Sequence, residues 1–145
     1  GYTRDEIIIL ASIIQAEAAN SDQMGMISAV LHNRLNNPGT YPKLECNSTK
    51  DYIKNKIAPN VSDGVATSLL ADYDTYKIEG LPPGPVCNPG QDAINAALYP
   101  DENYSEYFYF RHDVRGTIYM AKTSSEHREN GNTVLSVNSQ YGSGY

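Results

Sequence analysis

The segment YDTYKIEGLPPGPVCNPG, residues 73–90, restricts the fold of this chain more than any other stretch. From Gly80 onward it holds four prolines and three glycines, and proline fixes φ and lacks the N–H that helices and central strands require. The segment therefore separates regular elements and does not belong to one. Because Leu81, Val86 and Cys87 alternate with these turn residues, we predict a rigid, packed loop in preference to a linker.

Two amphipathic helices are predicted before this loop. Thr3-Arg4-Asp5-Glu6 is a capping box, and apolar residues then recur at spacings of three and four to about Ala19. A second apolar stripe runs from Met24 to Leu35 and stops at Asn36-Asn37-Pro38-Gly39. The chain is therefore expected to open with two antiparallel helices.

The C-terminal half is predicted to combine a helix, a β-hairpin and a second, short helix. Asn88 is expected to be the N-cap of the first of these helices, which ends at Tyr99-Pro100. Residues 104–121 alternate as a hairpin with its turn at residues 113–116. Thr123 to Glu126 forms another capping box, which opens the short helix.

The remaining segments complete an α+β fold. Residues 49–57 are expected to form a short helix, and residues 60–73 a loop with about one helical turn. The domain is expected to span residues 1–130, and the Ser, Gly and Asn content of residues 131–145 predicts a flexible tail. The expected order is two helices, an irregular Pro/Gly-rich region, a helix, a β-hairpin and a short helix, which defines the α+β class.

Composition excludes several functional classes. Forty per cent of residues are apolar and the net charge is −6, which indicates a globular domain without the basic run that nucleic acid requires. The longest apolar run, Ile7–Ala11, is too short to cross a bilayer. The three histidines are dispersed, so we expect no metal site. The two cysteines, Cys46 and Cys87, are compatible with one disulfide or with two free thiols.

Glu17 is the candidate for acid–base chemistry. It follows Ile14 by three residues on the apolar stripe of the first helix, whereas Gln15 lies to the side. A carboxyl group desolvated against isoleucine has its pKa raised, which keeps an acid catalyst protonated near neutral pH. Helical spacing leaves two interpretations open: a catalytic acid, or a helix-end carboxylate bonded to Arg34 or to backbone N–H groups.

Six segments together carry a resemblance to a known family. They are LASIIQAEA, HNRL, YDTYKIEGLPPGPVCNPG, AALYP, YFYF and AKTSSEH, and they follow the family order from about Ile8 to Asn130. The chain resembles the endolytic murein transglycosylases, also called the YceG-like family. The first family motif usually reads ASIxEKE, and its second Glu is the catalytic one. That residue matches Glu17, whereas the first Glu corresponds to Gln15.

The resemblance implies an enzyme that cuts the glycan strands of peptidoglycan between N-acetylmuramic acid and N-acetylglucosamine without water. One carboxylic acid protonates the leaving oxygen, and its carboxylate then takes a proton from the 6-hydroxyl of the same sugar. The product carries a 1,6-anhydro end. One carboxyl group thus performs both steps, whereas ordinary glycosidases use a pair. The implied function is a lytic transglycosylase in cell-wall assembly or remodelling, without a cofactor.

By position, the resemblance implies substrate-binding roles for six residues on the second helix and the central loop. They are Asn33, Arg34, Tyr73, Thr75, Tyr76 and Asn88. From the residues alone, capping explains the first two equally well, and packing explains each tyrosine. His127 matches the closing EH and is expected to be structural, bonding the hairpin. The chain departs from the family at Asn47-Ser48-Thr49, often Asp-Pro-Thr, and at Ile118, where the family has a histidine.

The resemblance also bears on the cysteines and on location. Cys46 and Cys87 fall in motifs expected to border the groove, so we predict that they form a disulfide, which an extracytoplasmic location permits. The implied location is the outer face of the bacterial cytoplasmic membrane or the cell wall, with a membrane anchor that is absent from this chain. Cell-wall synthases are the implied protein partners.

Three alternative functions remain at this point. Gln15 and Asn47 favour a glycan-binding or scaffolding module that has lost catalysis. A hydrolytic muramidase is the nearest alternative enzyme. A pyridoxal-phosphate lyase of aminodeoxychorismate would require a Schiff-base lysine in a phosphate pocket, but every lysine lies in a polar or loop context.

Overall fold

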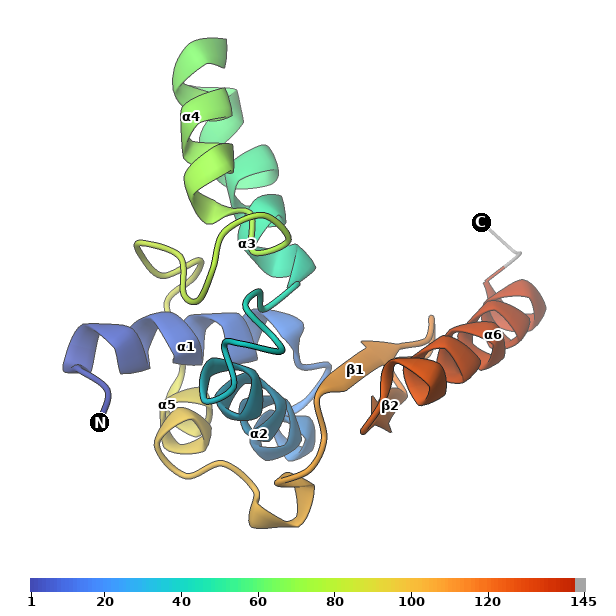
Figure 1. The fold of residues 1–145 in the computed structure, drawn as a ribbon. Coiled ribbons are helices and arrows are strands. Elements are labelled where there is room, and N and C mark those ends of the chain that lie inside the picture. Colours follow the sequence, from blue (N-terminus) through green and yellow to red (C-terminus); the bar gives the residue numbers. More distant parts are fainter. Residues whose placement is uncertain (143–145) are drawn as a thin grey trace.

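The computed structural model describes residues 1–142, and three helices form its centre (Figure 1). α1 (Arg4–Glu17), α2 (Met24–Leu35) and α5 (Gln91–Leu98) pack against one another in every pair. The fully buried core residues on these helices include Leu10, Ala11, Ile13, Ile14, Ile27, Leu31, Ala93 and Ala97. The predicted capping box is confirmed, because Thr3 and Glu6 each accept a hydrogen bond from the other's backbone N–H.

A helical arm rises from the end of α1 (Figure 1). It consists of α3 (Asn47–Tyr52), a π-helical turn η2 (Ile53–Ile57), a 3₁₀ turn η3 (Ala58–Asn60) and α4 (Asp63–Tyr73). The predicted loop at residues 60–73 is wrong, because α4 occupies most of it. The Ser62 hydroxyl caps α4 by accepting the Val65 N–H at 3.3 Å. α4 buries none of its residues and packs on the other turns of the arm, so no core stripe marks it in the sequence.

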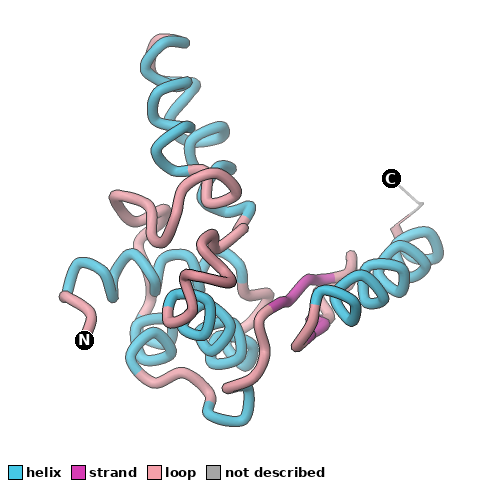
Figure 2. Tube along the Cα trace, viewed as in Figure 1, coloured by secondary structure: helices cyan, strands magenta, loops and turns pink. Residues whose placement is uncertain are grey.

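A two-stranded antiparallel hairpin forms the base of a second projection (Figure 2). Its strands are β1 (Tyr109–His112) and β2 (Ile118–Ala121), and His112 lies directly opposite Ile118. The predicted turn is confirmed: the Asp113 N–H donates to the Thr117 carbonyl, and Gly116 adopts φ +83°. β1 starts later than expected, because a 3₁₀ turn, η4 (Glu102–Tyr104), precedes it.

α6 (Ser124–Tyr141) packs on both strands and is much longer than the short helix expected. It runs through most of the predicted tail, whereas residues 143–145 lie outside the described part of the chain. Gly131 and Val134 are buried beneath the hairpin, and a Cβ on Gly131 would overlap the guanidinium of Arg111. This packing outweighs the low helix propensity of the Ser, Gly and Asn residues.

The proline- and glycine-rich segment packs along α1, as predicted. The Val86 N–H donates to the Ser12 hydroxyl at 3.0 Å, and the Gly90 N–H donates to Gln15 Oε1 at 3.0 Å. Gly90 is also the N-cap of α5, so the expected cap at Asn88 is wrong. Gln15 therefore fastens the end of this loop to the helix that carries Glu17.

The predicted disulfide between Cys46 and Cys87 is wrong, because both cysteines are free. Cys46 is buried before the first turn of α3, with its Sγ 3.7 Å from the Leu44 carbonyl oxygen. Cys87 is exposed on the proline-rich loop and donates to the Ser12 carbonyl oxygen at 3.2 Å. The two loops pack on different neighbours, and the thiols do not meet.

We expect the protein to show two thiols without reductant, only one of them reactive in the folded state. Burial raises the pKa of both thiols, and raises that of Cys46 well above its ordinary value. Cys87 should react with an aromatic disulfide reagent, and Cys46 only after denaturation. Cys87→Ser should leave the folded protein unreactive. If the denatured, unreduced protein showed no free thiol, the disulfide prediction would be correct after all.

Candidate active site

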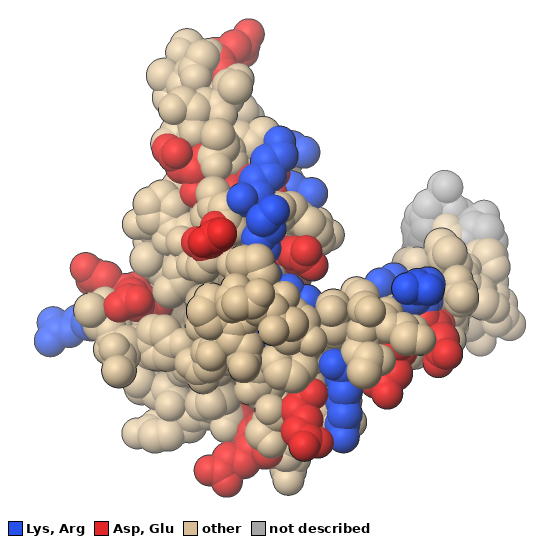
Figure 3. Space-filling view, in the orientation of Figure 1, with Lys and Arg blue, Asp and Glu red and all other residues tan. Residues whose placement is uncertain are grey.

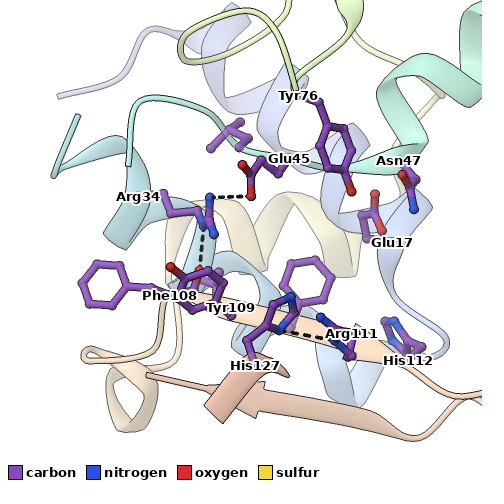
Figure 4. A pocket seen from close by; sticks show the side chains of 13 residues that line it. Glu17, Arg34, Glu45, Asn47, Tyr76, Phe108, Tyr109, Arg111, His112 and His127 are labelled. Atoms are coloured by element: carbon purple, nitrogen blue, oxygen red, sulfur yellow. Dashed lines mark hydrogen bonds and ion pairs between the residues drawn. The ribbon is translucent and has the colours of Figure 1, made fainter. Parts of the chain in front are cut away.

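Glu17 is the last residue of α1, at the foot of the arm. Its Oε1 accepts the backbone N–H of Ser48, in the first turn of α3, at 3.0 Å. The sequence had left open whether Arg34 or a backbone N–H bonds Glu17, and the structure shows a backbone N–H. The side chain is half-buried, and Figure 4 shows its carboxylate between Asn47 and the hydroxyl of Tyr76.

A cavity of about 550 Å³ opens at Glu17, between the arm and the hairpin (Figure 4). Of the predicted site residues, Glu17, Arg34 and Tyr76 line it. Eight further polar or aromatic lining residues were not assigned a binding or catalytic role from the sequence: Glu45, Asn47, Phe108, Tyr109, Phe110, Arg111, His112 and His127. The cavity thus combines one half-buried carboxylate with aromatic faces and with fixed hydrogen-bonding groups, which is a lining suited to sugars.

Arg34 is a buried cross-link in the wall of this cavity. Its Nε donates to the Phe108 carbonyl at 2.6 Å, and its Nη1 donates to the Lys43 carbonyl at 2.8 Å. The guanidinium also stacks on the Tyr109 ring at 4.8 Å and pairs with Glu45 at 3.6 Å. Arg34 therefore ties the start of β1 to the segment before α3.

Glu45 is a second carboxylate in the cavity. Among residues 1–142, Glu45 is the one non-glycine residue with a positive φ, which is 57°. Non-glycine residues in this region are strained and are held there by their surroundings. Here the Glu45 N–H donates to the Thr75 carbonyl at 3.1 Å, and the carboxylate faces Arg34.

Asn33 and Asn88 do not line the cavity, in contrast to the expectation for both. The Asn33 amide donates to the carbonyls of Tyr104 and Tyr107 at 2.9 and 2.8 Å. It therefore fixes the chain that leads into the hairpin. Asn88 is exposed on the proline-rich loop, away from Glu17.

Thr75 and Tyr73 also do not line the cavity. Thr75 is fully buried, and its hydroxyl accepts the Cys46 N–H at 2.9 Å and contacts the Thr49 hydroxyl at 3.0 Å. The ring of Tyr73 packs edge-on against Tyr52 inside the arm. Both residues hold the base of the arm in place, so only Tyr76 of this segment faces the cavity.

His127 contacts the hairpin, as expected, and also lines the cavity. Its Nδ1 accepts the Arg111 Nε–H at 3.4 Å, and its ring stacks on Tyr109 at 4.9 Å. Burial, with Arg111 and Arg34 nearby, lowers the pKa of His127 to about 4, so the ring is neutral at pH 7. Within residues 1–142 no three His, Cys, Asp or Glu side chains lie together so as to hold a metal ion.

β1 brings the residues that sequence reasoning missed. Consecutive residues from Phe108 to His112 line the cavity, because the strand runs along its floor (Figure 4). The period-2 rule would place Arg111 and His112 on opposite faces of a sheet. The family histidine is absent at Ile118, but His112 stands directly across the hairpin from it. The pairing of His112 with Ile118 across the hairpin could therefore have pointed to His112 from the sequence.

Figure 3 shows Lys and Arg side chains on the arm above the hairpin, with Asp and Glu side chains beside them. α3 and η2 carry Lys50, Lys54 and Lys56. The Lys50 ammonium lies 4.3 Å from the ring centroid of Tyr76, which lines the cavity. The arm therefore offers cations to an acidic ligand, although the whole chain is negatively charged.

Comparison with known proteins gives one consistent result. Residues 1–133 match the YceG-like family. The endolytic murein transglycosylase of Streptococcus pneumoniae strain D39 is 33% identical over 133 residues, which are 88% of this chain and 23% of that protein. The endolytic murein transglycosylase of Bacillus subtilis strain 168 is 32% identical over 126 residues, 86% of this chain and 33% of that protein.

A solved structure gives the same result. The 2.6 Å crystal structure of a YceG-like protein from Listeria monocytogenes superposes with a TM-score of 0.70 and 32% identity. The alignment covers 87% of this chain and 39% of that protein. The chain thus spans about a quarter to two fifths of the length of these relatives.

Proposed function

This chain belongs to the YceG-like family, and we propose from that membership that it is the part of a lytic transglycosylase that cleaves the glycan strands of peptidoglycan. Two relatives that it matches over most of its length carry the name endolytic murein transglycosylase. The observation that carries the proposal is the position of Glu17. The residue that matches the family's catalytic Glu lies at the mouth of the cavity with the aromatic lining.

Glu17 acts first as acid and then as base in the proposed reaction. The Ser48 N–H occupies Oε1, so Oε2 carries the proton and delivers it to the oxygen that leaves N-acetylmuramic acid. The bond between that oxygen and the anomeric carbon breaks. The Glu17 carboxylate then takes the proton of the 6-hydroxyl, whose oxygen bonds to the anomeric carbon. The products are a 1,6-anhydro end and a new hydroxyl, and no water is consumed.

The walls of the cavity supply substrate contacts in this proposal. Tyr76 offers its ring to a sugar, and the Arg34 cross-link keeps Phe108 and Tyr109 in place in the cavity wall. The lysines on the arm suit the carboxylates of stem peptides. Peptidoglycan lies outside the cytoplasmic membrane, so we propose an extracytoplasmic site of action next to cell-wall synthases. Within residues 1–142, no helix is both long enough and apolar enough to pass through a bilayer.

Mass analysis of the fragments released from purified peptidoglycan tests this function. We expect fragments that end in 1,6-anhydro-N-acetylmuramic acid and are lighter by one water than hydrolysed ends. Reducing N-acetylmuramic acid as the main product would indicate a muramidase, with Glu45 as the second carboxylate in the cavity. Retained glycan binding without turnover would indicate a lapsed module.

A further inference from the structure

The amide of Gln23 has a fixed orientation, because two of its partners can play only one role. The backbone N–H of Ala19 lies 3.0 Å from one terminal atom and can only donate, so that atom is Oε1. The carbonyl of Gly116 lies 2.9 Å from the other terminal atom and can only accept, so that atom is Nε2. Gln23 is also buried, so its amide has no room to turn over.

This orientation determines which nitrogen of His112 carries the hydrogen. Nε2 of His112 lies 2.8 Å from Gln23 Oε1, which can only accept. The Nε2 atom must therefore carry the hydrogen, and in a neutral ring Nδ1 then holds a bare lone pair. Within residues 1–142 the His112 Nδ1 makes no hydrogen bond. Ser48 Oγ is the one enclosed side-chain polar atom there that lacks a partner, so the His112 Nδ1 is not fully enclosed.

His112 therefore offers a fixed hydrogen-bond acceptor in the cavity that contains Glu17. Figure 4 shows its ring on the floor of the cavity, on the same side as the Glu17 carboxylate. His127, the other histidine there, has its Nδ1 occupied by Arg111 and so offers only a donor. Sugar hydroxyls are the donors that a lone acceptor beside a catalytic acid would bind.

We propose that His112 is a substrate-positioning residue whose Nδ1 accepts a hydrogen bond from a hydroxyl of the sugar bound against Glu17. The role rests on the proposed function. The charged groups that act on His112 are Glu17 from α1 and Asp113 from the hairpin turn. Burial lowers the pKa of His112 below its ordinary value, although Glu17 and Asp113 oppose that shift, so the acceptor persists at pH 7.

Nitrogen NMR of the ¹⁵N-histidine-labelled Glu17→Gln variant tests the acceptor without turnover. In the free protein, His112 should show hydrogen on Nε2 only. Saturation with a soluble oligosaccharide of N-acetylglucosamine and N-acetylmuramic acid should shift Nδ1 towards a hydrogen-bonded value and leave Nε2 in place. Hydrogen on Nδ1, or a static His112 while other cavity signals move, would overturn the inference. If no signal moves, the proposed function itself fails, and this role fails with it.

Two variants separate the acceptor from the bond to Gln23. His112→Asn places an oxygen near the Nδ1 position, and His112→Gln places an amide near Nε2 but no acceptor at Nδ1. We expect His112→Gln to lower kcat/KM about tenfold at pH 7 and His112→Asn to retain most of it. Wild-type activity should fall at acidic pH as Nδ1 gains a proton, and His112→Asn should lack that fall. Equal rates for both variants, or an unchanged acid limb in His112→Asn, would contradict the proposal.

Discussion

Glu17→Gln is expected to fold like the wild-type protein and to lose glycan cleavage by about 10²–10⁴-fold. Glutamine keeps the size of the side chain and an oxygen that can accept the Ser48 N–H, so the contact with α3 survives. It cannot deliver a proton to the leaving oxygen or remove one from the 6-hydroxyl. Release of anhydro-muropeptides from purified peptidoglycan measures the loss, and thermal unfolding checks the fold.

Two control variants make this test specific. Gln15→Ala changes the same helix and removes the bond to the Gly90 N–H, but Gln15 does not line the Glu17 cavity, so its cost should be far smaller. Glu45→Gln removes the other carboxylate of the cavity. A loss in Glu45→Gln equal to that in Glu17→Gln would point to two-carboxylate chemistry, and an active Glu17→Gln would remove the proposed acid altogether.

Arg34→Met should be the most destabilising substitution in the cavity wall, by about 2–4 kcal/mol. Methionine fills similar space but leaves the carbonyls of Phe108 and Lys43 without their donor, in a place where Arg34 is only 5% exposed. The strained Glu45 also loses its ion-pair partner. Urea denaturation at pH 7 measures the change, and activity should fall with it because β1 loses its tie to the segment before α3.

The geometry of the guanidinium, as well as its charge, should matter at this position. Arg34→Lys keeps the charge, but one ammonium cannot reach both carbonyls as Nε and Nη1 do, so most of the loss should remain. Arg128→Met, on the exposed side of α6, should change stability by less than about 0.5 kcal/mol. An Arg34→Met protein as stable as the Arg128→Met control would contradict the cross-link.

Local signals in the sequence were sufficient for the elements that build the core. The Thr3–Glu6 capping box and the apolar stripes predicted α1 and α2, because burial of one helix face repeats at a fixed spacing. α4 was missed for the opposite reason, since it buries no face. The helical part of the predicted tail was missed because Gly131 and Val134 are buried against the hairpin, a contact that no pattern within the tail itself shows.

Site residues, too, could be predicted only where a local sequence signal marks them. Helical spacing and the family motif pointed to Glu17, and the structure places that residue in a cavity that suits the chemistry. The other site predictions depended on which loops lie next to each other in the fold, and no local sequence pattern encodes that. The cysteine pairing failed because two motifs thought to border one groove pack on different partners. His112 was missed because the contact that orients its ring is made by Gln23, 89 positions away.

The two sides of the site are expected to differ in how easily they unfold locally: α1 resists opening more than α4 of the arm does. α1 is anchored by fully buried Leu10, Ile13 and Ile14, so its amide hydrogens exchange with solvent mainly through unfolding of the whole domain. α4, which buries no residue, is expected to be among the least protected helices of the same molecule. The Ser48 N–H that holds Glu17 comes from this arm. Because Thr49 and Thr75 at the base of the arm are fully buried, we expect α4 to open locally while the Ser48 N–H stays bonded to the carboxyl group of Glu17.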